Sequence, residues 1–193
     1  MITHLGDISE IQVGYQSREG IHPQINGNHF LLQTRDFDNH HQINWSNLIK
    51  FTPSGFGAKS EVRKGDVLFL AKGQDNYAIF INFERDNILA GNSFYIIRTN
   101  PETVLPDFLA WWINQTPAQE YIRLNRSGSS LPFLSVASLS NLEVPIPDTK
   151  IQQKICKLET LRRKESDLLI RYLTKKYALI QAVCLNAISK GEE

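Results

Sequence analysis

The chain has little cysteine and no excess of charge of either sign. Of its 193 residues only 2 are cysteine, and Cys156 and Cys184 form no Cys-x-x-Cys motif, so a zinc or redox site of that kind is not expected. Both fall in a segment predicted as one helix, about 42 Å apart at 1.5 Å per residue, which is too far for a disulfide within the chain. Two ordinary buried thiols are predicted.

Positive and negative charges nearly cancel over the whole sequence. The 21 lysines and arginines against 20 aspartates and glutamates give a net charge of +1, which provides no overall argument for a nucleic-acid or membrane partner. The balance hides an asymmetry, because residues 1–147 carry a net charge of −3 and residues 148–193 a net charge of +4. The C-terminal part is therefore a different kind of segment.

The sequence also lacks long hydrophobic runs. None approaches the ~20 residues of a membrane span, and the first residues, MITHLGDISE, lack the basic start and apolar stretch of a signal peptide. We therefore expect a cytoplasmic protein with no membrane partner.

No complete catalytic or metal-binding motif is present. The loop Ser54–Ser60 has the lysine and serine of a phosphate-binding loop, but the positions that require glycine are Pro53 and Ala58. The 5 histidines do not follow the spacing of metal ligands. Motifs of restriction nucleases and of base methyltransferases are incomplete as well. The sequence predicts no enzymatic activity, no cofactor and no metal.

Short strand-like runs separated by turn residues fill the chain from Met1 to about Thr99. Four examples are Phe30–Gln33, Asp66–Leu70, Tyr77–Ile81 and Ser93–Ile97. Turn residues on both sides of the second run predict a hairpin from Val67 to Ile81.

Short helices and one further strand are predicted between this region and residue 147. Pro106 stands at a first-turn position of a helical pattern that runs to Ile113, and Thr116 is predicted to cap a second helix that runs to Leu124. A helical turn is predicted over Ser135–Leu139, and an edge strand over Leu142–Ile146. The fold class is therefore α+β, with a β-rich domain over residues 1–147.

A long helix is predicted over residues 148–190, followed by a tail of residues 191–193. Thr149 is predicted as its N-cap with Gln152 three residues on, and no Gly or Pro intervenes before Ser189. About 40 helical residues would be roughly 60 Å long. An apolar stripe of that length lies partly on the β-rich domain or pairs with another long helix. The dimer-interface residues predicted from the stripe are Ile155, Leu158, Leu169, Leu173, Ile180 and Cys184.

Two polar segments are the strongest candidates for recognition of a nucleic acid, because they combine cations, amides, hydroxyls and one aromatic ring. The first is the turn Lys72–Tyr77, for which an ordinary hairpin turn is the competing interpretation, and the second begins at Arg126. Local basic patches that include Lys50 and Arg123 would have to supply the affinity. The predicted DNA-binding residues are Lys59, Lys72, Gln74, Asn76, Tyr77, Arg126, Ser129 and Ser130.

A series of short motifs follows a fixed order along nearly the whole chain. They are Leu5–Ile8, Gln33–Asp36, Lys64–Phe69, Leu105–Leu109, Gly128–Ser130, Ser138–Leu139, Val144–Pro147 and Ile151–Ile155 leading into the long helix. In this order and spacing the chain resembles the target-recognition domain of type I restriction-modification specificity subunits. Each motif alone is weak, and their combination is specific.

The resemblance implies a subunit without catalysis of its own that reads a DNA half-site and docks methyltransferase and restriction subunits. Such subunits commonly carry two recognition domains and two long helices, whereas this chain has one of each. It is similar to a half-length form of such a subunit. That form is a naturally dimeric protein, the product of a truncated gene or a fragment, and the sequence leaves these three alternatives open. A competing hypothesis is an adaptor that assembles a complex through its helix and binds no DNA.

Overall fold

The computed structural model describes residues 1–17, 20–38, 41–54 and 60–190. The chain divides into two units, Met1–Gln153, here called the body, and Lys154–Glu193. The predicted contact residue Lys59 and the predicted tail, residues 191–193, lie outside the described residues. No described helix is long and apolar enough to cross a membrane.

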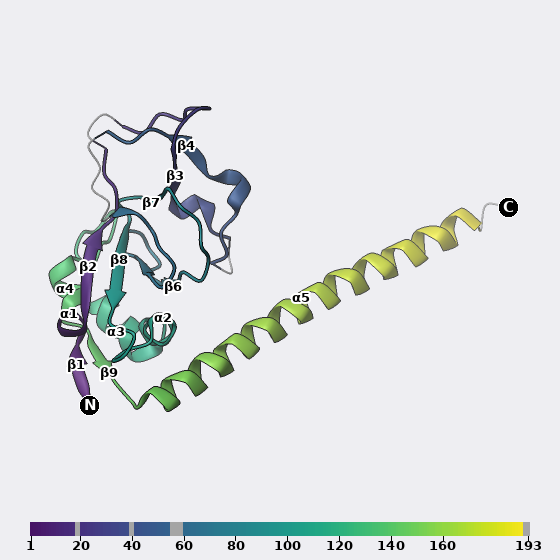
Figure 1. Ribbon diagram of the computed structural model, residues 1–193. Helices are drawn as coiled ribbons and strands as arrows, with labels where there is room; N and C mark the ends of the chain where they lie inside the picture. Colours follow the sequence, from purple (N-terminus) through teal and green to yellow (C-terminus); the bar gives the residue numbers. More distant parts are fainter. Residues whose placement is uncertain (18–19, 39–40, 55–59, 191–193) are drawn as a thin grey trace. The chain divides into compact units, whose positions relative to one another are not determined.

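The main sheet of the body has four antiparallel strands in the order β2-β8-β5-β6 (Figure 1). Their bounds are β2 (Ser9–Val13), β8 (Phe94–Thr99), β5 (Val67–Leu70) and β6 (Ala78–Phe80). Strands β5 and β6 form the predicted hairpin, with Leu68 opposite Ile79. Strand β5 has a neighbouring strand on each side, and all four of its residues are buried. Its continuous hydrophobic run is therefore that of a strand covered on both faces of the sheet.

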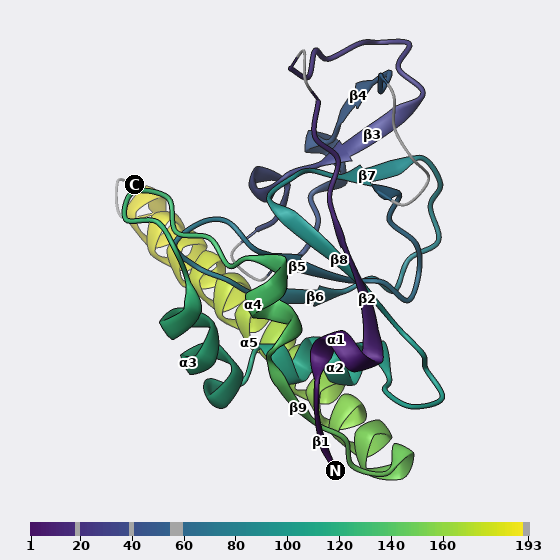
Figure 2. The same ribbon diagram turned by 90° about the vertical axis from the view of Figure 1, so that its left-hand side faces the viewer.

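A smaller sheet has the order β4-β3-β7, where β3 pairs antiparallel with β4 and parallel with β7. Its strands are β3 (His29–Leu32), β4 (Ile49–Phe51) and β7 (Ile88–Ala90). Figure 2 shows the three strands together beside the main sheet. Strand β1 (Ile2–His4) pairs with β9 (Glu143–Pro145), which confirms the predicted strand at a sheet edge.

The short helices of the body are α1 (Leu5–Ile8), α2 (Pro106–Ile113), α3 (Thr116–Asn125) and α4 (Val136–Ser140). Helix α2 begins at Pro106 as predicted. The prediction that Thr116 caps α3 was wrong, because Thr116 is already helical and the backbone carbonyl of Gln115 accepts the first helical hydrogen bond, from Gln119 N–H at 2.9 Å.

The long helix α5 runs from Thr149 to Lys190, as the absence of Gly and Pro predicted. Thr149 is not its cap, which corrects the sequence-based prediction. The carboxylate of Asp148 accepts a hydrogen bond from the backbone N–H of Ile151 at 2.9 Å. An aspartate satisfies a free N–H and places negative charge at the positive end of the helix dipole. Neither cysteine forms a disulfide, and the prediction that both are buried was wrong, since Cys184 is exposed and Cys156 is partly exposed.

Gln152 was predicted as the residue that follows the Thr149 N-cap by three positions at the start of the helix. Its side chain is instead fully buried. Its amide oxygen accepts from Leu105 N–H at 2.9 Å, and its amide nitrogen donates to the carbonyls of Thr103 (3.1 Å) and Pro147 (2.9 Å). All these groups belong to the body, so one side chain joins the first turn of α5 to the segment that leads into α2.

We expect Gln152→Ala to lower the free energy of unfolding by about 3 kcal/mol, because it leaves the buried N–H of Leu105 and two carbonyls without partners. The neighbouring Gln153 is exposed, so Gln153→Ala is a matched control that should change the stability by less than about 0.5 kcal/mol. Chemical denaturation of both variants measures this. Equal stabilities for the two variants would contradict the structural role of Gln152.

Candidate nucleic-acid interface

The structure brings together the two polar segments that the sequence singled out. The turn between β5 and β6 lies against the segment 126–134. Gly73 N–H donates to the carbonyl of Pro132 and Leu134 N–H to the carbonyl of Ala71, both at 2.9 Å, and Lys72 is bridged to Phe133. We call residues 72–77 and 126–133 together the paired-loop surface.

Glycines make the tight turns of this surface possible. Gly73 has φ +129° and Gly128 has φ +90°, conformations that L-residues with a Cβ rarely adopt. Between these turns, Ser127 and Phe133 exchange two backbone hydrogen bonds of 2.9 Å. The buried hydroxyl of Tyr95 on β8 donates to the carbonyl of Leu134 at 2.8 Å and joins the second segment to the main sheet. The paired-loop surface is therefore fixed on a rigid scaffold.

Arg126 connects the two halves of the paired-loop surface. Its guanidinium donates to the backbone carbonyl of Gln74 at 2.6 Å and approaches the side-chain oxygen of Asn76 at 3.4 Å. One of its nitrogens is therefore used inside the protein. The side chain is partly exposed, and its other donors make no hydrogen bond within the described part of the chain.

Asn76 does not present its amide for recognition, which corrects the sequence-based assignment. The residue is 8% exposed, and its amide nitrogen donates to the carbonyl of Leu70 at 2.9 Å. The hairpin needs this amide internally, because the carbonyl at the end of β5 would otherwise lack a partner. Asn76 is therefore a positioning residue of the turn.

Tyr77 is half-buried and its ring stacks on His41, with ring centroids 3.7 Å apart and an angle of 13° between planes. Burial, assisted by the negative charge of Asp75, raises the pKa of Tyr77 above its usual value. One face of the Tyr77 ring is therefore covered by His41, which lies in the segment before Trp45, so the ring is not open on both faces.

Four of the predicted contact residues present polar atoms to the outside. Gln74, Ser129 and Ser130 are exposed, and Lys72 is partly exposed. A groove of about 460 Å³ runs beside the turn, from Gln74 across Asn114 to Arg123. It contains the carboxylates of Asp75 and Glu120 as well as the guanidiniums of Arg123 and Arg126, so it offers both acceptors and donors to a polar ligand.

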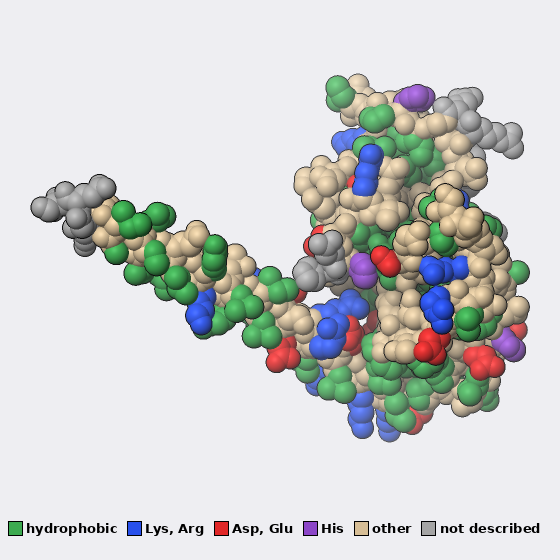
Figure 3. Space-filling view, turned by 180° about the vertical axis from the view of Figure 1, so that it is seen from behind, with side chains coloured by type: hydrophobic (Ala, Val, Ile, Leu, Met, Phe, Trp, Pro, Cys, Tyr) green, Lys and Arg blue, Asp and Glu red, His purple; other side chains and the backbone are tan. Residues whose placement is uncertain are grey.

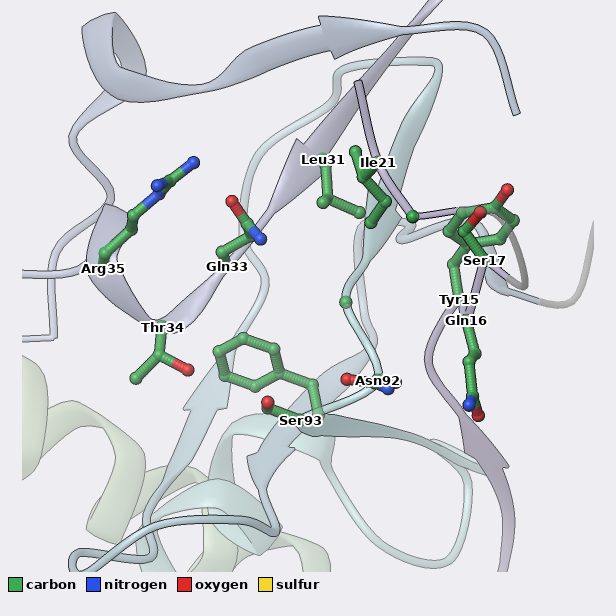
Figure 4. Close-up of a pocket in the computed structure, with 13 residues that line it drawn as sticks. Tyr15, Gln16, Ser17, Ile21, Leu31, Gln33, Thr34, Arg35, Asn92 and Ser93 are labelled. Atoms are coloured by element: carbon green, nitrogen blue, oxygen red, sulfur yellow. The ribbon is translucent and has the colours of Figure 1, made fainter. Parts of the chain in front are cut away.

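A second polar cavity, of about 580 Å³, escaped the sequence-based site prediction (Figure 4). Gln33 and Arg35 reach it from the end of β3, and Asn92 from the turn before β8. Asp36 beside them is 1% exposed, and its carboxylate accepts from Gln33 N–H at 2.7 Å. Burial raises the pKa of Asp36 against the lowering effects of that hydrogen bond and of Arg35. In the sequence, this cavity is signalled by the run Gln33–Asp36, which is one of the motifs that carry the family resemblance.

No group of three or more His, Cys, Asp or Glu residues that could hold a metal ion occurs among the described residues.

Comparison with known proteins places these observations in a family. The family model of the type I restriction modification DNA specificity domain matches residues 3–168. The specificity subunit of the type I restriction enzyme HindI from Haemophilus influenzae is 33% identical over 108 residues, which cover 53% of this chain and 23% of that protein.

Solved structures share the fold at low sequence identity. The HsdS subunit from Thermoanaerobacter tengcongensis is 17% identical with a TM-score of 0.62, over 89% of this chain and 39% of that one. The S subunit of a type I system from M. genitalium is 14% identical with a TM-score of 0.57, over 85% and 39%. A structure concerning complex assembly and conformational transition of the type I R-M system is 17% identical with a TM-score of 0.66, over 95% and 43%. The chain spans about a quarter to two fifths of these proteins.

The neighbouring amides Gln74 and Asn76 allow a matched test of the site geometry. We expect Asn76→Ala to lower the free energy of unfolding by about 1–2 kcal/mol, because it leaves the carbonyl of Leu70 unpaired. Gln74→Ala removes an exposed amide and should change stability by less than about 0.5 kcal/mol. Thermal unfolding of the two variants measures the difference, and a destabilising Gln74→Ala with a neutral Asn76→Ala would show that the two roles are reversed.

Proposed function

The chain belongs to the family of type I restriction-modification DNA specificity domains, and from this premise we propose that it binds one half of a bipartite DNA site. The observation that carries the proposal is the paired-loop surface, where Lys72, Gln74 and Ser129 offer a cation, an amide and a hydroxyl on a rigid sheet. Cations of this kind bind phosphates, and amides read base edges in the major groove.

We propose that the chain contributes no catalytic chemistry. Its partners would be double-stranded DNA and the methyltransferase and restriction subunits of the same system, which supply the reactions. Family membership supports the assignment of these reactions to the partner subunits. We expect it to work in the cytoplasm, where its proposed DNA target lies, and to require neither a cofactor nor a metal.

The faces of α5 support a role in assembly. At 100° per residue, the six predicted interface residues fall within an arc of roughly 80°. Four of them are more than half exposed: Leu158 (67%), Leu169 (55%), Leu173 (60%) and Ile180 (52%). Hydrophobic side chains along the helix are visible in Figure 3. A stripe of this width matches the seam of a coiled coil, and we propose that a second copy of the chain covers it around a two-fold axis.

The two halves of α5 differ in the width of their apolar faces. Up to Leu161 the isoleucine and leucine side chains cover an arc of roughly 120°, whereas from Leu168 to Ile188 the isoleucine, leucine and valine side chains cover more than roughly 200°. A helix that is apolar over most of its circumference is covered by more than one neighbour. We propose that the distal half meets helices of a partner subunit in addition to the second copy.

A polar interval separates these two halves. Arg162 and Arg163 bind the carboxylate of Glu159 at 2.7 Å and 2.8 Å. The hydrogen bond from Arg162 is the main cause that lowers the pKa of Glu159 to about 2. Because Arg162 and Glu165 stand where the apolar stripe would continue, this interval breaks the seam. We propose that it acts as the spacer between the two contact regions.

The adaptor hypothesis makes a different prediction about DNA. An adaptor would assemble through α5 and leave the paired-loop surface without a ligand. A sequence-specific shift of a duplex by the chain together with its methyltransferase excludes the adaptor. No sequence preference in a pool of random duplexes would instead support it.

Substitutions in the paired-loop surface test the DNA proposal. Lys72→Ala should weaken binding to all duplexes and lower the slope of log K against log salt by about one unit, because one phosphate contact is lost. Gln74→Ala should cost roughly 1–3 kcal/mol on the preferred site and little elsewhere, because it removes a base contact. Selection from random duplexes with the methyltransferase present supplies the preferred site. Unchanged affinity and preference after replacement of residues 72–77 would refute the assignment.

Light scattering tests the pairing of α5. We expect a mass of twice 22.1 kDa at micromolar concentration, falling to 22.1 kDa for the double variant Leu169→Asp, Ile180→Asp, because charges in a buried seam are not tolerated. Ala178→Asp is the matched control, since Ala178 lies roughly 160° around the helix from the stripe. A wild-type chain that is monomeric alone and also as a single copy with its methyltransferase would contradict the dimer.

A further inference from the structure

A second cationic surface lies on the small sheet of the body, away from the residues that the sequence singled out. The guanidinium carbon of Arg85 lies 5.1 Å from the ring centre of Phe30 and 4.7 Å from that of Trp45. The ammonium of Lys50 lies 5.3 Å from the same Phe30 ring. Cations at these distances are attracted to the faces of aromatic rings. We call Phe30, Trp45, Lys50 and Arg85 the stacked-cation surface.

The rings of this surface are held in place by the core. Phe30 is partly buried and packs against the main hydrophobic cluster, as does Phe83. Phe83 in turn meets Trp45 edge-on, with ring centres 4.7 Å apart and an angle of 85° between planes. Arg85 therefore lies against two rings whose positions are fixed, and it has already lost much of its conformational freedom before any ligand binds.

The charges of this surface are not neutralised inside the protein. Within the described part of the chain, neither the guanidinium of Arg85 nor the ammonium of Lys50 makes a hydrogen bond or an ion pair, and both residues are exposed. The adjacent carboxylate of Glu84 is engaged by Lys64 at 2.7 Å. Both cations lie just over 5 Å from the centre of one ring, so they repel each other, and an anion bound at this surface relieves the repulsion.

We propose that the stacked-cation surface is a binding site for the phosphodiester backbone of DNA, an inference that rests on the proposed function. A guanidinium held by aromatic rings presents its N–H groups in a fixed fork that matches two phosphate oxygens, and the ammonium adds a second point of contact. Two adjacent cations fit a continuous line of negative charge better than the neutral edge of a base.

The net charge of the body gives a second reason for a phosphate site, since residues 1–147 carry a net charge of −3. A body with that charge repels DNA overall, so its affinity depends on places where cations gather without carboxylate partners. Tyr77 of the paired-loop surface and Phe30 of the stacked-cation surface border the same hydrophobic cluster. One duplex would therefore be read at the first surface and held by its backbone at the second.

The experiment measures binding of the full chain, with its methyltransferase, to the selected duplex and to a scrambled duplex over a range of salt concentrations. Arg85→Ala and Lys50→Ala should each weaken binding to both duplexes by roughly 5–10-fold at 0.1 M salt and lower the salt slope by about 0.9. Arg85→Lys keeps the charge without the planar fork and should lose less affinity than Arg85→Ala. Asp86→Asn removes a neighbouring negative charge and should strengthen binding.

Arg171→Ala is the matched control, because it removes the same side chain from the polar face of α5 and should leave affinity and salt slope unchanged. If the wild type prefers its selected duplex but Arg85→Ala and Lys50→Ala bind with wild-type affinity and slope, the stacked-cation surface is not a DNA site and the proposed function stands. Loss confined to the selected duplex would assign a base contact instead. Loss of the methyltransferase from the complex would assign a protein contact. A wild type without sequence preference refutes the proposed function itself.

Discussion

The buried amide of Gln152 is the interaction on which the organisation of this chain depends. A primary amide has donors and acceptors on one planar group, so a single side chain satisfies a backbone N–H and two carbonyls that no neighbouring strand reaches. These partners lie in the segment before α2 and in the strand exit at Pro147. The first turn of α5 is thereby part of the body.

Inside the body, a second polar group joins the main sheet to the turn before it. The carboxylate of Asp66 is 4% exposed and accepts from Arg98 on β8 at 2.8 Å and 3.0 Å, and also from the backbone N–H of Arg63. The hydrogen bond to Asp66 is the main cause that raises the pKa of Arg98. These hydrogen bonds hold the start of β5 in place. The opposite end of the hairpin therefore presents its side chains from a fixed position.

Local patterns predicted strands β3, β5, β6, β8 and β9, the hairpin at Val67–Ile81, the start at Pro106 and the whole length of α5, because these depend on periodicity and on the absence of helix breakers. The capping residues of α3 and α5 and the burial of Gln152 and Asn76 were not predictable, since each is decided by a carbonyl or N–H distant in sequence. The stacking of Arg85 was missed for the same reason, because Phe30 and Trp45 come from other segments. The two polar segments singled out from the sequence lie side by side in the structure, but which of their amides faces outward depends on packing.

The two apolar faces of α5 are separated by the polar interval at Glu159–Glu165. Their relative orientation restricts which lengths of this helix keep the two faces aligned. Each residue inserted between them rotates the distal face by 100° against the proximal stripe, so an insertion of one or two residues would turn the face proposed for a partner subunit to the wrong side. Seven residues restore the alignment to within about 20°. If the proposed contacts exist, natural length variants of this helix should differ by whole heptads, and the proposed reach along DNA would change in steps of about 10 Å.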